Sequence, residues 1–290
     1  MITEGILVKG VGGNYEIMTK QGRVVCKARG RFRKDQLVPV VGDRVQVLDN
    51  GGAGARIEEI LPRKNQLVRP PVSNIDRLFV VTAASSPEPD FFLLDKIIVS
   101  ALSQGIEVSL CINKIDTADP SGIEEVYRKA GFPVYPTCAK EGIGIEAVRR
   151  ALLGGVTAFA GASGVGKSSL LNAIDERLVL KTSDISEKIE RGRHTTRHVE
   201  LFEIAPDTYV FDTPGFSSFE VFNVKAKELI RYFPDLDSYA DGCPFSDCSH
   251  TREEECAVRQ AVREGKVPLA RWESYLALYE KLKERKEWER

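Results

Sequence analysis

The segment that most constrains the fold is residues 161–168, GASGVGKS, which fits the pattern G-x-x-x-x-G-K-[ST]. A short apolar run precedes it and a helical pattern follows it, as a strand–loop–helix unit requires. Glycines let successive N–H groups turn toward phosphate oxygens, and the following helix adds its positive N-terminal end. The segment therefore predicts a nucleotide-phosphate site within an α/β domain, in preference to a glycine-rich turn without a ligand.

Two side chains of this loop have distinct predicted roles. Lys167 would reach the β- and γ-phosphates and stabilise charge on the oxygen that bridges them, which makes it a candidate catalytic residue. Ser168 would hold Mg²⁺ through its hydroxyl. The predicted phosphate-binding residues are Gly161, Ala162, Ser163, Gly164, Val165, Gly166, Lys167, Ser168 and Ser169.

A phosphate loop does not select the base, but residues 113–116, NKID, can do so. The Asp116 carboxylate can accept hydrogen bonds from guanine N1–H and the 2-amino group, and adenine has neither donor there. The Lys114 stem would lie over the base, and Asn113 would tie this loop to the phosphate loop. The tetrapeptide alone is weak evidence, but residues 137–140, TCAK, follow the next strand and can offer an N–H to guanine O6. The predicted base-binding residues are Asn113, Lys114, Ile115, Asp116, Cys138, Ala139 and Lys140.

Residues 212–215, DTPG, have the D-x-x-G form of a nucleotide switch. Asp212 would hold Mg²⁺ through water, and the Gly215 N–H would contact the γ-phosphate. The segment RGRHTTR lies between the two phosphate motifs, where a switch threonine is expected. Thr196 is the predicted Mg²⁺ ligand beside Ser168 and Asp212, with Thr195 as the alternative.

These motifs occur in the order base, base, phosphate, switch, switch. A site depends on which loops meet in space and not on their order along the chain, and chain termini often lie close together. The order therefore predicts a circularly permuted GTPase domain. Its D-x-x-G switch would lead directly into the C-terminal region, so a change in the switch would act on the next domain.

Alternating apolar patterns predict a mostly parallel sheet covered by helices on both faces. Ser121 is a candidate N-cap for one of these helices. Strands are expected over 75–84, 106–113, 132–137, 157–161, 198–204 and 208–215, and helices over 90–105, 121–131, 144–154 and 168–174. The C-terminal region is expected to be helical, with Trp272, Tyr275, Leu278 and Leu282 forming a core stripe.

Residues 4–61 contain short apolar runs separated by Gly-Gly and Asn-Gly turns, which predicts a small β-barrel with the OB-fold as the leading candidate. Residues 1–69 hold 13 basic and 7 acidic residues, a net charge of +6 against −1 for the whole chain. One connector is either a solvated loop or a phosphate-tracking RNA contact with a stacking aromatic ring. Its candidate RNA-binding residues are Lys27, Arg29, Arg31, Phe32, Arg33 and Lys34.

Four metal-ligand side chains cluster near the C-terminus in the spacing C-x4-C-x-H-x5-C: Cys243, Cys248, His250 and Cys256. Three thiolates and one imidazole make a tetrahedral Zn²⁺ site, and four protein ligands leave no open position for water. We therefore predict one structural zinc ion in preference to buried free thiols. No apolar run is long enough to span a bilayer and no secretory leader is recognised, so a cytoplasmic location is expected. The chain is also expected to be a monomer.

Together these motifs resemble the RsgA (YjeQ) family, the ribosome small-subunit-dependent GTPases, over nearly the whole chain. The resemblance implies binding to the 30S ribosomal subunit and 16S rRNA late in assembly, with GTP hydrolysis stimulated by that subunit. We expect three domains: an OB-fold RNA-binding domain at 1–68, a permuted GTPase domain at 69–222, and a zinc-binding helical domain at 223–290.

Ras-type GTPases carry a glutamine after D-x-x-G to orient the attacking water, but this chain has Phe216 there. His194, beside the switch threonines, is the candidate replacement, and packing or RNA contact is its alternative role. Two other functions are alternatives for the chain. One is a non-enzymatic RNA-binding scaffold gated by GTP, and the other is a permuted GTPase acting on another RNA or at a membrane.

Overall fold

The computed structural model describes residues 2–30, 32, 37–49, 54–68, 70–178, 199–212 and 224–288. The chain divides into two compact units. The first unit comprises residues 1–77, 149–159 and 171–216, and the second comprises residues 78–148, 160–170 and 217–290. None of the helices in these described ranges combines the length and apolar character that crossing a membrane requires.

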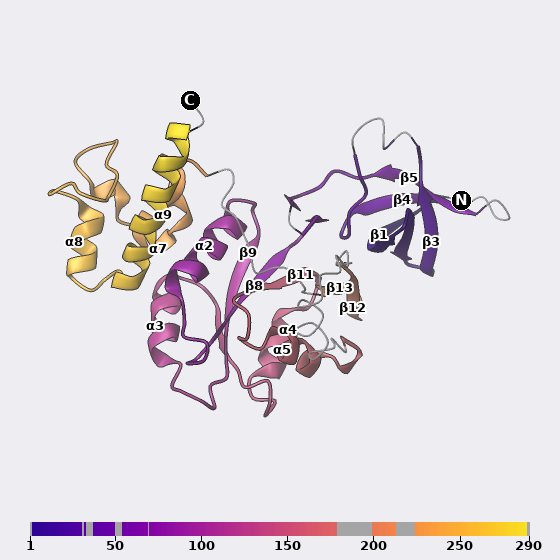
Figure 1. Cartoon of the computed structure of the whole chain (residues 1–290), viewed down its shortest axis with the longest axis horizontal. Coiled ribbons are helices and arrows are strands. Elements are labelled where there is room, and N and C mark those ends of the chain that lie inside the picture. Colours follow the sequence, from indigo (N-terminus) through magenta and orange to yellow (C-terminus); the bar gives the residue numbers. More distant parts are fainter. Residues whose placement is uncertain are drawn as a thin grey trace. The chain divides into compact units, whose positions relative to one another are not determined.

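The N-terminal strands form a closed five-stranded barrel (Figure 1). They are β1 (Ile2–Val11), β2 (Asn14–Thr19), β3 (Gly22–Ala28), β4 (Arg44–Asp49) and β5 (Ala55–Ile60). Their order is β1-β2-β3-β5-β4, with β3 and β5 parallel and the other neighbours antiparallel. Gly12 and Gly13 join β1 to β2 with φ of 59° and 84°, which a two-residue hairpin turn favours. The predicted barrel is confirmed, whereas the predicted Asn50-Gly51 turn lies outside the described residues.

Alternating side chains of the strands fill the barrel, including the fully buried Leu7, Ile17 and Val45. Phe32, in the connector after β3, is also buried, with 5% of its surface exposed. A buried ring is not available to stack on a base. The prediction of Phe32 as a stacking aromatic is therefore corrected: its role is to pack.

The segment after the barrel, which the composition suggests is a plain linker, is held by buried polar contacts. Arg63 donates to both carboxylate oxygens of the fully buried Asp43, at 2.7 and 2.8 Å, and Ser73 Oγ donates to the same carboxylate at 2.6 Å. Asn65 exchanges two hydrogen bonds with the backbone of Ile75. Two short strands, β6 (Gln66–Leu67) and β7 (Val72–Ser73), pair within it. The connector is therefore a folded element.

Six strands form the central sheet in the order β10-β9-β8-β11-β13-β12. They are β8 (Arg77–Ala83), β9 (Glu107–Asn113), β10 (Val134–Pro136), β11 (Gly155–Ala160), β12 (Leu201–Ala205) and β13 (Thr208–Phe211). In this sheet the pairs β10–β9 and β11–β13 are parallel, and the end strand β12 pairs antiparallel with β13. Strands β9 and β11 end where the base and phosphate motifs begin, as ligand loops do in open α/β sheets.

The helices between these strands lie close to the predicted ranges. They are α2 (Phe91–Leu102), α3 (Ser121–Lys129), α4 (Ile145–Ala151), α5 (Lys167–Ile174) and the short 3₁₀ turn η2 (Glu176–Leu178). The prediction of Ser121 as an N-cap is wrong, because Pro120 occupies the cap position without a side-chain bond. Asp119 instead accepts hydrogen bonds from the Ser121 N–H and hydroxyl, at 3.0 and 2.6 Å.

The C-terminal region consists of helical segments that share a core with α2 in the second unit (Figure 1). The segments are η3 (Ala226–Tyr232), α7 (Pro234–Asp237), η4 (Ala240–Gly242), α8 (Ala257–Arg263) and α9 (Leu269–Trp288). Tyr275, Leu278 and Leu282 of α9 are buried, and Trp272 packs against the same core. The predicted core stripe is thus confirmed, and it covers one face of α2 through Val99.

Candidate functional site

The phosphate loop at 161–166 follows β11 and requires glycine at two crowded positions. A Cβ on Gly161 would lie 2.1 Å from the Val81 carbonyl oxygen, and a Cβ on Gly166 would lie 2.4 Å from Asn113 Nδ2. Both residues also have positive φ, at 148° and 92°. Any side chain there would force the loop away from β8 or from the base loop, so the glycines fix its shape.

Lys167 begins α5 and its side chain folds back over the phosphate loop. Its Nζ donates to the carbonyl oxygens of Gly161 and Ala162, at 2.8 and 2.7 Å. Burial lowers the pKa of Lys167 to about 8, since few groups nearby compensate the ammonium. A polyphosphate would supply the missing counter-charge, which is the chemistry expected of this lysine.

Asn113, the last residue of β9, connects three loops through its side-chain amide. Its Nδ2 donates to the Val165 carbonyl of the phosphate loop at 3.0 Å. Its Oδ1 accepts from the Ala139 N–H at 3.1 Å and from Thr137 Oγ1 at 3.3 Å. The side chain is 2% exposed, so these bonds are protected from water. The NKID, TCAK and phosphate loops therefore meet in the second unit.

The predicted base-reading edge consists of Asp116, which is exposed, and the loop that follows β10. Cys138 Sγ donates to Asp116 Oδ1 at 3.2 Å and so orients the carboxylate. The Ala139 N–H is already bonded to Asn113, and the next N–H, that of Lys140, has no partner within the described structure. The unpaired Lys140 N–H lies two residues after Cys138, which orients the Asp116 carboxylate. Together they offer one donor and two acceptor oxygens to the edge of a purine.

Sequence reasoning missed a fourth loop, residues 84–90, which follows β8. Lys114 Nζ donates to the Ser86 carbonyl oxygen at 2.6 Å, and Ser85 Oγ shares a hydrogen bond of 2.8 Å with Thr117 Oγ1. These bonds fix the Lys114 stem, whose backbone adopts the left-handed region at φ 62°. The sequence indicates this loop only through its location, because it follows the carboxyl end of a predicted strand, where ligand loops of open α/β sheets lie.

Of the predicted switch residues, Asp212 is within the described part of the chain, where it directly follows β13. Its N–H donates to the Glu200 carbonyl oxygen at 2.8 Å. Oxygen donors such as this carboxylate and the Ser168 hydroxyl suit Mg²⁺. The other predicted switch residues, His194, Thr195, Thr196, Gly215 and Phe216, lie outside the described residues.

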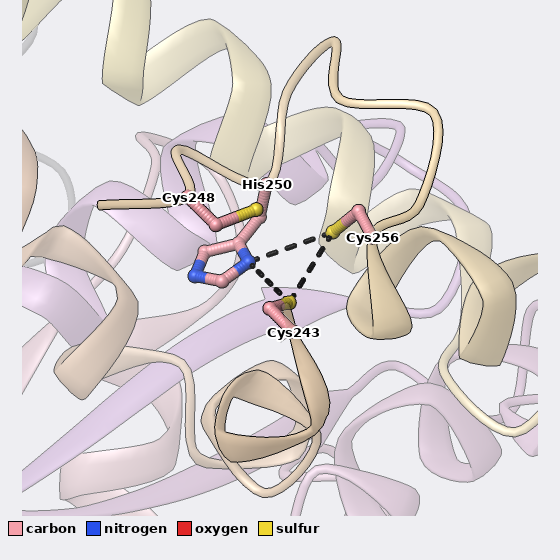
Figure 2. A group of neighbouring side chains, drawn as sticks. All are labelled: Cys243, Cys248, His250 and Cys256. Atoms are coloured by element: carbon pink, nitrogen blue, oxygen red, sulfur yellow. Dashed lines mark hydrogen bonds between the residues drawn. The ribbon is translucent and has the colours of Figure 1, made fainter. Parts of the chain in front are cut away.

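The predicted metal ligands of the C-terminal region converge on one point (Figure 2). Ligand atoms of Cys243, Cys248, His250 and Cys256 all lie within 4.8 Å of one another. Cys243 Sγ is 3.8 Å from Cys256 Sγ, and each of these sulfurs is 3.5 Å from His250 Nδ1. A zinc tetrahedron with Zn–S of about 2.3 Å and Zn–N of about 2.0 Å has edges of about 3.8 and 3.5 Å. The cluster therefore fits a tetrahedral zinc ion.

Neighbouring groups hold the loop that carries these ligands. Trp272 Nε1 donates to the His250 carbonyl oxygen at 3.3 Å, and the Tyr275 hydroxyl donates to the Ser249 carbonyl oxygen at 2.9 Å. Glu253 accepts from Ser249 Oγ and several backbone N–H groups, and these bonds outweigh its burial and lower the pKa of Glu253 to about 2. Burial lowers the pKa of His250, which favours the neutral imidazole that metals bind.

The candidate RNA-binding residues of the barrel are only partly within the described residues. Lys27 on β3 is exposed, and Arg29 forms an ion pair with Glu58 of β5. The remaining basic candidates, Arg31, Arg33 and Lys34, lie outside the described residues. The structure thus leaves Lys27 as the candidate whose charge is exposed on the barrel.

Comparison with known proteins places these features in a family context. A family model described as RsgA GTPase matches residues 60–222, and one described as RsgA N-terminal domain matches residues 4–55. The small ribosomal subunit biogenesis GTPase RsgA of Ruminiclostridium cellulolyticum is 42% identical over 286 residues, which cover 97% of this chain and 94% of that protein. The protein of the same name from Caldanaerobacter subterraneus subsp. tengcongensis is 45% identical over 285 residues, with 97% and 96% covered.

Two solved structures are similar over nearly their full length. The crystal structure of YjeQ from Thermotoga maritima has a TM-score of 0.83 at 35% identity, and the match covers 97% of this chain and 99% of that one. The crystal structure of YloQ, described as a circularly permuted GTPase, has a TM-score of 0.82 at 33% identity, with 98% and 96% covered. The barrel, the permuted order of loops and the C-terminal helices therefore recur together.

Proposed function

Because this chain belongs to the RsgA GTPase family, we propose that it is a GTP hydrolase that acts in late assembly of the small ribosomal subunit. It binds the 30S particle and 16S rRNA, acts as a monomer in the cytoplasm, and is stimulated by the subunit. The single observation that carries the nucleotide part is the Asn113 side chain, which joins the base-reading loops to the phosphate loop. Domain boundaries at 1–68, 69–222 and 223–290 are part of the proposal.

In this site Asp116 accepts the guanine N1–H and 2-amino hydrogens, and Lys114 lies along the base. The Lys140 N–H donates to guanine O6, since the Ala139 N–H is already engaged. This arrangement selects guanine over adenine, because adenine would leave the carboxylate without donors. The loop at 84–90 contributes by holding Lys114 in place.

The phosphates lie against the N–H groups of residues 161–169, with Lys167 at the β- and γ-phosphates. Ser168, Thr196 and Asp212 would hold Mg²⁺, which would supply positive charge to the phosphate oxygens. The Gly215 N–H contacts the γ-phosphate. Phe216 has no group that orients water, so His194 takes this role or the subunit supplies it.

The barrel tracks rRNA phosphates through Lys27, Arg29, Arg31, Arg33 and Lys34, supported by the basic charge of this region. Phe32 is not included, because it is buried. In the C-terminal region, one zinc ion bound by three thiolates and one imidazole has a structural role, since four protein ligands leave no position for a substrate.

Multiple-turnover phosphate release tests the proposal. The protein alone should hydrolyse GTP slowly, and purified 30S particles should raise the rate by at least about 10²-fold, whereas 50S particles should not. Lys167→Ala should abolish release, with Lys140→Ala as a lysine control that keeps the proposed backbone donor. Hydrolysis that no ribosomal particle stimulates would contradict the assembly role, and binding without turnover would favour the GTP-gated scaffold.

The same assay separates the two roles considered for His194. If it orients water, His194→Ala lowers the stimulated rate by about 10²-fold while GTP affinity stays unchanged. A stimulated rate equal to the unaltered protein, with nucleotide binding intact, would leave packing or RNA contact as its role.

Removal of one metal ligand should empty the zinc site. Changes to groups that only support ligands cost about 10–100-fold in metal affinity, so Cys256→Ser, which removes a ligand, should cost more. Elemental analysis should find one zinc per unaltered chain and close to none in the variant. Cys26→Ser, at a buried cysteine of the barrel, is the matched control. Equal zinc content in both variants would exclude Cys256 as a ligand.

A further inference from the structure

The barrel contacts the end of the central sheet at one charged residue within the first unit. Lys9 of β1 forms an antiparallel bridge with Glu200, the residue before β12. Lys9 Nζ also donates to Glu200 Oε2 at 2.7 Å, with the two side chains 33% and 19% exposed. This hydrogen bond raises the pKa of Lys9. Partial withdrawal from water makes the pair stronger than one on an open surface.

Glu200 is at the same time the backbone partner of Asp212. The Asp212 N–H donates to the Glu200 carbonyl oxygen at 2.8 Å, one position beyond the pairing of Leu201 with Phe211. Glu200 is therefore held by the barrel through its side chain and holds the D-x-x-G aspartate through its backbone. A shift of β1 would therefore alter the Lys9–Glu200 ion pair and, through Glu200, the hydrogen bond to the Asp212 N–H.

A second barrel contact reaches the residue before Asp212. Gly42, in the loop before β4, has φ of 97°, and a Cβ there would lie 3.2 Å from Phe211 Cζ. The Gly42 N–H donates to the Leu7 carbonyl oxygen of β1 at 2.8 Å, so this loop and β1 are tied together. Phe211 is fully buried. The chain neighbour and the pairing partner of Asp212 thus both rest on the barrel.

We propose that the barrel positions Asp212, with Lys9 and Glu200 as the positioning residues. The inference rests on the proposed function only where it treats Asp212 as a magnesium residue. Its consequence is reciprocal: nucleic acid bound to the barrel and magnesium nucleotide bound at Asp212 change each other's affinity by the same factor. The subunit would then stimulate hydrolysis in part through β1.

Amide hydrogen exchange on the nucleotide-free protein tests the contact without reference to GTP. Lys9→Glu places two carboxylates together and should speed exchange of the Asp212 amide about fivefold. The charge swap Lys9→Glu with Glu200→Lys should restore the original rate. Lys20→Glu makes the same change of charge at an exposed lysine of the barrel and should have no effect. Exchange at the original rate in Lys9→Glu would overturn the proposal.

A second measurement tests the link to magnesium. Affinity for fluorescent methylanthraniloyl-GDP is measured with Mg²⁺ and with EDTA. The ratio of the affinity with Mg²⁺ to the affinity with EDTA should be about fivefold smaller in Lys9→Glu than in the unaltered protein, with the EDTA affinity unchanged. Lys9→Arg should behave as the unaltered protein. An equal loss under both conditions would indicate general damage and contradict positioning. A chain that binds no nucleotide would refute the proposed function, while the exchange result would still decide the contact.

Discussion

Replacing Asp116 with asparagine should reduce GTP affinity by about 10³-fold and transfer the preference to xanthosine triphosphate. In the proposed site the carboxylate accepts two donors from guanine, and each such bond to a charged acceptor contributes about 2 kcal/mol. An asparagine NH₂ would face the 2-amino group as a second donor. Xanthine has a carbonyl at that position, so the same NH₂ would bind it. Competition between the two nucleotides for the variant measures the change.

Asp119→Asn is the matched control for this prediction. Asp119 is an exposed carboxylate three residues further along, and its partners are the N–H and hydroxyl of Ser121. Its loss should leave base selectivity unchanged. If Asp116→Asn still preferred GTP over the xanthine nucleotide, NKID would not be the base reader, however well Asn113 joins it to the phosphate loop.

The sequence allowed the prediction of elements whose residues act through local backbone chemistry. Gly161 and Gly166 are required by the shape of their loop, so a glycine pattern predicts the loop. The strands before NKID and before the phosphate loop are continuous apolar runs, and the structure places strands there. The barrel followed from short runs and the Gly12-Gly13 turn.

Long-range polar pairs could not be predicted in this way. Lys9 and Glu200 are 191 positions apart, and a single charged residue has no periodicity that names its partner. The composition of the segment after the barrel suggests a plain linker. Its order comes from Asn65 and from Arg63 bonded to buried Asp43, and composition does not show such bonds. Ser121 failed as a cap because the residue before it, Pro120, took the position.

A long-range group of three buried charges should dominate the stability of the C-terminal region. Arg271 of α9 is fully buried between two carboxylates, Asp95 of α2 and Asp235 of α7, and bonds to both. Its guanidinium lies 4.5 Å from the centre of the Phe233 ring. A single positive charge thus serves two buried negative charges. Burial raises the pKa of Asp95 to about 6 despite the neighbouring Arg271.

Arg271→Met should lower the free energy of unfolding of this region by about 3–5 kcal/mol, because it leaves buried carboxylates without a partner. Both tryptophans of the chain, Trp272 and Trp288, are on α9, so urea unfolding followed by tryptophan fluorescence reports on this helix. Arg252→Met removes an arginine whose side chain is 86% exposed and should cost less than about 0.5 kcal/mol. Similar losses in the two variants would show that the buried charges do not dominate.

The same triad fixes the sign of a pH effect. Because the pKa of Asp95 is higher in the folded protein than its ordinary value of 3.8, the folded state binds a proton that the unfolded chain releases between about pH 4 and pH 6. This group therefore stabilises the fold as the pH falls through 6, and its contribution is lost as the pH rises again. Asp95→Asn should remove that dependence while keeping the Arg271 pair with Asp235. If Asp95→Asn kept the pH dependence of the free energy of unfolding, Asp95 would not titrate in this range.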